Sequence, residues 1–104
     1  MKTPDDARPL AAARWARSVA QCVIYKQGTV PQLLRATWIA DGNRAMEDAA
    51  GDADLSGIVA KVVQLARDLP LESAAEAVSR ATLLADPLSC AVEALVPKEH
   101  AKAI

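Results

Sequence analysis

Few side chains in this chain of 104 residues could act as a nucleophile, a general base or a metal ligand. The two thiols, Cys22 and Cys90, are far apart in the sequence, and neither has a basic cluster beside it that would favour a reactive thiolate. The single histidine, His100, lies near the C-terminus with no Ser, Cys or carboxylate held beside it, and a general base has to be positioned before it can act. We therefore predict a protein that is not an enzyme and uses no cofactor.

A second candidate for chemistry is the segment 52–57, which begins like the calcium loop of an EF-hand. It places oxygen ligands at positions one, three and five and a glycine at position six. Position nine is Ala60, and position twelve, which has to supply a bidentate glutamate, is Val63. A calcium ion would keep too few oxygens, so we predict no metal site. The acidic residues Asp52 and Asp54 suit the start of a helix, where the helix dipole favours negative charge.

The elements that position these residues are predicted to be helices alone. Hydrophobic residues make up 52% of the chain, yet only 3% of it is aromatic, phenylalanine is absent and alanine occurs 23 times. Alanine is the strongest helix former, and the alternating runs of β-branched and aromatic residues that indicate strands are missing. The composition therefore predicts an all-α fold.

Prolines, glycines and capping residues divide the chain into five predicted helices, which cover residues 9–27, 29–50, 52–69, 73–86 and 87–96. Capping boxes are predicted at Thr29 with Gln32 and at Ser73 with Glu76, because each pair can satisfy free N–H groups in a first helical turn. Proline is tolerated in a first turn and breaks a helix interior. We therefore expect Pro87 to end the fourth helix and to begin a short fifth one.

The dipeptide at residues 41–42 is typical of a turn. However, Trp38, Ala45 and Ala49 share one face only if the helix continues through Gly42. We predict a continuous helix in which the missing side chain of Gly42 lets a neighbouring helix approach. The short connections favour antiparallel neighbours. They predict a small, mostly antiparallel up-and-down bundle that forms one domain over residues 1–104, with flexible ends at 1–8 and 97–104.

The expected location is the cytoplasm. No apolar run approaches the ~18 residues that are needed to cross a membrane, so we expect no membrane partner. Arg14 and Arg17 interrupt the first apolar stretch, which leaves no hydrophobic segment typical of a signal peptide. Two unpaired thiols fit a reducing compartment.

DNA binding is an alternative function. Residues 1–44 carry 7 basic and 3 acidic side chains, whereas residues 45–104 carry 5 basic and 10 acidic ones. Segment 71–82 looks like the start of a helix-turn-helix, since an acidic, alanine-rich stretch leads into Ser79 and Arg80. It lacks the turn glycine, and Ala77, Ala81 and Leu84 keep helical register through the supposed turn. The acidic surroundings also disfavour contacts with phosphates. A nucleic-acid partner would have to use this segment or the two basic N-terminal helices.

Large apolar side chains outside the predicted buried faces, together with the tryptophans and the arginines near them, are the candidate partner-binding residues. Tryptophan and arginine are enriched at the energetic centres of protein interfaces, and several exposed leucines could join into a patch that requires a partner. The candidates are Leu10, Arg14, Trp15, Arg17, Ile24, Leu33, Arg35, Trp38 and Leu83. Core packing remains an alternative for both tryptophans. We expect a homodimer, and a second protein partner that competes for the same surface.

In length, alanine-rich helicity, low aromatic content and exposed apolar helix faces, the chain is similar to the small all-helical bacterial anti-activators of LuxR-type quorum-sensing regulators. The resemblance implies a regulatory protein that binds a transcription regulator through an apolar helical surface. It further implies that the regulator loses dimerisation or DNA binding. The expected function is therefore that of a protein-protein interaction module.

Overall fold

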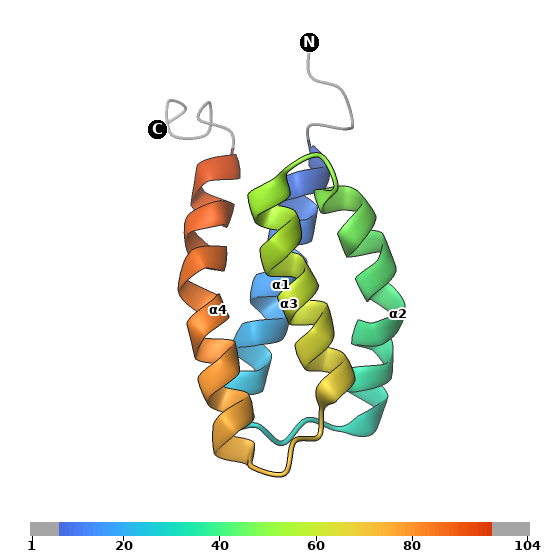
Figure 1. Ribbon diagram of the computed structural model, residues 1–104, viewed down its shortest axis with the longest axis vertical. Coiled ribbons are helices and arrows are strands. Elements are labelled where there is room, and N and C mark those ends of the chain that lie inside the picture. Colours follow the sequence, from blue (N-terminus) through green and yellow to red (C-terminus); the bar gives the residue numbers. More distant parts are fainter. Residues whose placement is uncertain (1–6, 97–104) are drawn as a thin grey trace.

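The computed structural model describes residues 7–96, which form four helices (Figure 1). These are α1 (Arg8–Tyr25), α2 (Gln32–Ala49), α3 (Ala53–Asp68) and α4 (Ala74–Leu95). Consecutive helices run in opposite directions, α1 packs against the three others, and α2 and α4 lie on opposite sides without packing against each other. The predicted all-α, up-and-down arrangement is confirmed. The ends predicted to be flexible lie outside the described residues, apart from Ala7 and Arg8.

The prediction of five helices is wrong, because the fourth and fifth are one helix, α4, with Pro87 in its interior. Proline at this position removes the hydrogen bond to the carbonyl of Leu83 and crowds the preceding turn, at a cost of about 3 kcal/mol. Ala81, Leu88 and Val92 are nevertheless all buried on one face of α4. Burial of this continuous face on both sides of the proline outweighs the local cost.

Of the three helix starts at which Thr29, Asp52 and Ser73 are predicted, two have the expected residue as a side-chain cap. An Asp52 carboxylate oxygen accepts from the N–H of Leu55 at 3.1 Å, and the Ser73 hydroxyl accepts from the N–H of Glu76 at 3.2 Å. The capping box at Thr29 is wrong, since α2 begins at Gln32 after Pro31 and has no side-chain cap. The residue before a proline is disfavoured in helical conformation, so this helix cannot begin ahead of Pro31.

The core is built from alanines and valines on α1, from mostly larger aliphatic side chains on α3, and from both kinds on α4. The contact between α1 and α4 is the most extensive of any helix pair. The buried residues of α1 are alanines and valines, namely Ala12, Ala13, Ala16, Val19, Ala20 and Val23. Those of α3 are Leu55, Val59, Val62, Val63, Leu65 and Ala66. Ile58 of α3 is half-buried and packs against this core.

Gly42 lies inside α2 and is buried, as predicted. A Cβ atom built on Gly42 would lie 3.2 Å from one methyl of Val63 and 3.3 Å from the other. The absence of a side chain therefore lets α2 and α3 approach closely at this point, and the helical periodicity correctly overrides the turn signal.

A tight turn ends α1. Gln27 and Gly28 have positive φ values of 57° and 83°. The N–H of Gly28 donates to the carbonyl of Val23 and that of Gln27 to the carbonyl of Ile24, both at 2.9 Å, which forms a Schellman motif. A Cβ atom on Gly28 would lie only 2.9 Å from the carbonyl carbon of Ala74, at the start of α4. The turn thus places the start of the connection between α1 and α2 against the first residue of α4.

Candidate interaction surfaces

The structure divides the predicted partner-binding residues into core and surface positions. Trp38 is only 7% exposed and belongs to the core, so it fills volume between helices and is closed to a partner. Leu10, Trp15 and Ile24 are half-buried and pack against the core. These four side chains therefore contribute to folding, and only the three half-buried ones present part of their surface to solvent.

The three predicted arginines differ in their exposure. Arg14 is exposed, whereas Arg17 and Arg35 are half-buried. The Nε atom of Arg35 is buried and has no hydrogen-bond partner among the described residues. Arg14 is thus the most accessible of the three.

Among residues 7–96, three large apolar or aromatic side chains are mostly exposed: Tyr25 at 85%, Leu33 at 82% and Leu83 at 75%. The two leucines are among the predicted residues, and Tyr25 is not. Helical register places Tyr25 on the side of α1 opposite Ala16, which is fully buried. That register is the signal in the sequence that could have identified it.

Tyr25 and Leu33 belong to a surface formed by neighbouring flanks of α1 and α2. They lie at the ends of the short connection 26–31, at the same end of the bundle (Figure 1). Helical spacing continues both flanks toward the other end of the hairpin. We call this the α1–α2 surface, and its members are Ala11, Trp15, Ser18, Cys22 and Tyr25 on α1 and Leu33, Thr37, Asp41, Arg44 and Asp48 on α2.

An open pocket of about 260 Å³ occupies the end of the α1–α2 surface that lies away from Tyr25 and Leu33. Trp15 lines it from α1, and Asp41, Arg44 and Asp48 line it from α2. Within the described part of the chain, none of these three charged side chains forms an ion pair or side-chain hydrogen bond. The pocket therefore offers two carboxylates, one guanidinium and part of an indole ring to a binding partner.

Leu83 lies on a different side of the molecule. It borders an open groove of about 310 Å³ between α3 and α4, which is lined by Lys61, Arg80, Leu83 and Leu84. Since α4 does not pack against α2, Leu83 and Leu33 cannot form one continuous patch. The expected single surface is thus two separate apolar sites.

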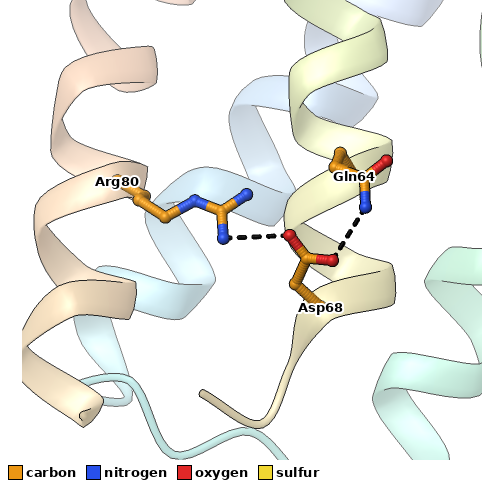
Figure 2. A network of polar contacts seen from close by, with 3 residues as sticks. All are labelled: Gln64, Asp68 and Arg80. Atoms are coloured by element: carbon orange, nitrogen blue, oxygen red, sulfur yellow. Dashed lines mark hydrogen bonds and ion pairs between the residues drawn. The ribbon is translucent and has the colours of Figure 1, made fainter. Parts of the chain in front are cut away.

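A polar network holds the groove-lining Arg80 in place (Figure 2). The guanidinium of Arg80 lies 3.0 Å from a carboxylate oxygen of Asp68, and the amide of Gln64 donates to the other oxygen at 2.7 Å. The hydrogen bond from Gln64, together with the hydrogen bond and charge of Arg80, lowers the pKa of Asp68. Asp68 thereby fixes the position of Arg80 across the gap between α3 and α4.

The segment that resembles the start of a helix-turn-helix contains no turn between helices. Residues 74–82 are the first part of α4, which continues without a break to Leu95. Together, α3 and α4 form an antiparallel hairpin (Figure 1), whereas the helices of a helix-turn-helix cross at about 90–120°. The prediction of one uninterrupted helix through residues 77–85 is confirmed.

Between residues 7 and 96, no helix is long and apolar enough to span a membrane. The same residues contain no group of three or more His, Cys, Asp or Glu side chains arranged to hold a metal ion.

The fold and these surfaces define a class, the small up-and-down helical bundles with exposed apolar helix flanks. No protein-family model matches the chain, and no match to it was found among the curated proteins or the solved structures.

Proposed function

We propose that the protein is a non-enzymatic interaction module that binds a helical segment of another protein on its α1–α2 surface. The observation that carries this proposal is the exposure of Tyr25 and Leu33 at one end of a surface that leads to an open pocket at the other. Burial of an exposed leucine contributes roughly 1.5–3 kcal/mol, and tyrosine is among the residues most enriched at interface centres.

The geometry of the α1–α2 surface favours a partner of particular chemistry. Tyr25 lies fourteen positions after Ala11 on α1, which corresponds to about 21 Å of helix. A partner helix of similar length would place apolar side chains against Tyr25 and Leu33. The pocket is lined by two carboxylates but only one guanidinium, that of Arg44, and Trp15 supplies an aromatic face. This end favours a lysine or arginine side chain of the partner.

The resemblance to anti-activators indicates which partner to test first. A LuxR-type transcription regulator held through one of its helices would lose the use of that helix in dimerisation or DNA binding. The proposed role is therefore inhibition of a transcription regulator by occupation of its surface.

Two matched variants test the proposal. Leu33→Glu and Leu83→Glu introduce the same charge at positions of similar exposure, 82% and 75%, on surfaces that do not meet. Partners are captured from a native extract, identified, and titrated against both purified variants by calorimetry. Leu33→Glu is expected to weaken binding at least tenfold, because it removes the leucine burial and places a charge in the contact. Leu83→Glu is expected to bind as the parent protein does.

Equal binding by the Leu33→Glu variant and the parent would refute the proposed surface. The unfolding midpoint of each variant serves as the folding control, since an exposed substitution is expected to change stability by less than about 0.5 kcal/mol. Titration with duplex DNA at low salt tests the alternative function. Tight, salt-sensitive DNA binding in the absence of any protein partner would replace the proposal.

A further inference from the structure

The groove between α3 and α4 is a second site, separate from the α1–α2 surface. Its walls combine two cations, Lys61 and Arg80, with two apolar side chains, Leu83 and Leu84. Leu83 is 75% exposed, while Arg80 is fixed by its ion pair with Asp68 (Figure 2). The groove therefore suits an occupant that brings an apolar side chain and a carboxylate together.

The outer side of α4 carries an apolar row that runs from this groove. Leu83, Pro87, Cys90 and Ala94 are all exposed and follow one another at intervals of four, three and four residues. This is the spacing at which two helices pack in a coiled coil. The row points away from the buried face of α4 and is not covered by any described residue, so it is available to another helix.

The charged residues on the two sides of Leu83 favour a second copy of α4 as the helix that packs on this row. Arg80 lies three residues before Leu83, and the exposed Asp86 lies three residues after it. If two copies of α4 pack antiparallel with Leu83 at the twofold axis, Arg80 faces Asp86 of the partner subunit. The same contact then occurs twice, as a symmetric dimer requires. A parallel pair would set equal charges beside each other at both levels.

We propose that a second copy of this chain occupies the α3–α4 groove through an antiparallel pairing of the two α4 helices. Leu83 of each subunit enters the groove of the other, and Arg80 pairs with Asp86 across the interface. This dimer leaves the α1–α2 surface open, because α2 does not pack against α4. Self-association and partner binding then use different surfaces and do not compete.

Light scattering tests the stoichiometry. The parent protein is expected to have twice the 11.0 kDa mass of one chain, and Leu83→Glu is expected to be a monomer with unchanged helical content. Asp86→Arg is expected to weaken the dimer at least tenfold, because it sets like charges opposite each other. Leu33→Glu is the matched control and is expected to remain dimeric. A monomeric parent protein, or a dimer that survives Leu83→Glu, would overturn the inference.

Oxidative cross-linking tests the orientation. Antiparallel pairing about Leu83 places the two Cys90 residues about 21 Å apart along the helix axis, which is too far for a disulfide. It places the two residues at position 83 side by side. Leu83→Cys is therefore expected to form a covalent dimer rapidly, while the parent does not. Rapid cross-linking through Cys90 in the parent would indicate a parallel pairing and contradict the proposal.

Loss of partner binding and loss of the dimer are separately observable. Leu33→Glu tests partner binding on the α1–α2 surface, and Leu83→Glu tests dimer formation through the apolar row on α4. Failure of either proposal therefore leaves the other testable.

Discussion

The turn after α1 provides a stability prediction in which two neighbouring residues respond in opposite directions. Gln27 has a φ of 57° and occupies the position of a Schellman motif that most often holds glycine. A residue with a Cβ atom costs roughly 1–2 kcal/mol in this left-handed conformation. Gln27→Gly removes that cost and retains both backbone hydrogen bonds of the motif.

The expected gain follows from two opposing contributions. Relief of the left-handed conformation stabilises the fold by about 1–2 kcal/mol, and the greater freedom of glycine in the unfolded chain offsets about 0.4–1 kcal/mol of this. The net gain for Gln27→Gly is about 0.5–1 kcal/mol, which corresponds to a melting temperature higher by about 3–6 °C for a domain of this size.

Gly28 is expected to behave in the opposite way. Its φ is 83°, and a Cβ atom on it would overlap the backbone of Ala74, 2.9 Å from the carbonyl carbon. Backbone atoms cannot move aside as a flexible side chain can. Gly28→Ala therefore adds a packing clash to a strained conformation, and we expect it to destabilise the fold by about 2–4 kcal/mol.

Thermal and urea unfolding followed by circular dichroism measure both effects. Gln21→Gly is the matched control, because Gln21 is an exposed glutamine inside α1 and glycine there costs roughly 0.5–1 kcal/mol. The two Gln→Gly variants should thus shift the midpoint in opposite directions. A loss of stability at both positions would show that Gln27 does not hold the left-handed conformation.

Two further substitutions test the α3–α4 hairpin. The pKa of Asp68 is lowered chiefly by the hydrogen bond from Gln64 and then by Arg80. The contribution of the Asp68 carboxylate to stability is therefore present above the ordinary aspartate pKa of about 3.9, and it is lost as the pH falls below that value. Urea unfolding should show Asp68→Asn to be less stable than the parent at neutral pH, and this difference should vanish in acid. A difference that stays constant with pH would show that the ionised carboxylate of Asp68 does not stabilise the fold. Pro87→Ala restores an N–H to the interior of α4 and should stabilise the fold by about 1–3 kcal/mol in thermal unfolding. A lower midpoint would show that the proline ring makes contacts that outweigh the restored hydrogen bond.

Long, strongly periodic helices are the part of this fold that sequence reasoning predicts well. The apolar residues of α3 recur at helical spacing between an aspartate cap and a proline, so both its boundaries and its buried face are predictable. The same periodicity decides correctly in favour of a continuous α2 through Gly42. Where a local turn signal conflicts with a long buried face, the buried face prevails, since it involves more contacts.

Pro87 is an instance of this rule that local reasoning gets wrong. The core register from Ala81 to Leu88 and Val92 continues across the proline, yet the strong helix-breaking tendency of proline dominates a sequence-based judgement. At Thr29 the error has a different origin. The capping pattern is present, but Pro31 restricts the residue before it and delays the start of α2.

The candidate surfaces are less predictable because exposure depends on how neighbouring helices pack. Leu33 and Leu83 are identified correctly as exposed, while their separation on opposite sides of the bundle depends on the order of the helices in space. Trp38 lies on the buried face of α2 and fills core volume, whereas Tyr25 is nearly as exposed as a side chain can be. Chemical type alone would rank these two residues in the reverse order as interface candidates.

The same packing that stabilises the bundle leaves large apolar side chains on its flanks. Alanines on α1 and α4 let the two helices approach closely, so little volume remains between them for a large side chain. Among the large apolar residues of α4, Leu88 is fully buried, whereas Leu83 lies outside. A single exposed leucine is ordinary in a soluble protein, but Leu33 and Tyr25 are both exposed near the α1–α2 connection, and Leu83 borders a groove with two cations. The large apolar side chains that this bundle exposes therefore lie on the flanks of its helices.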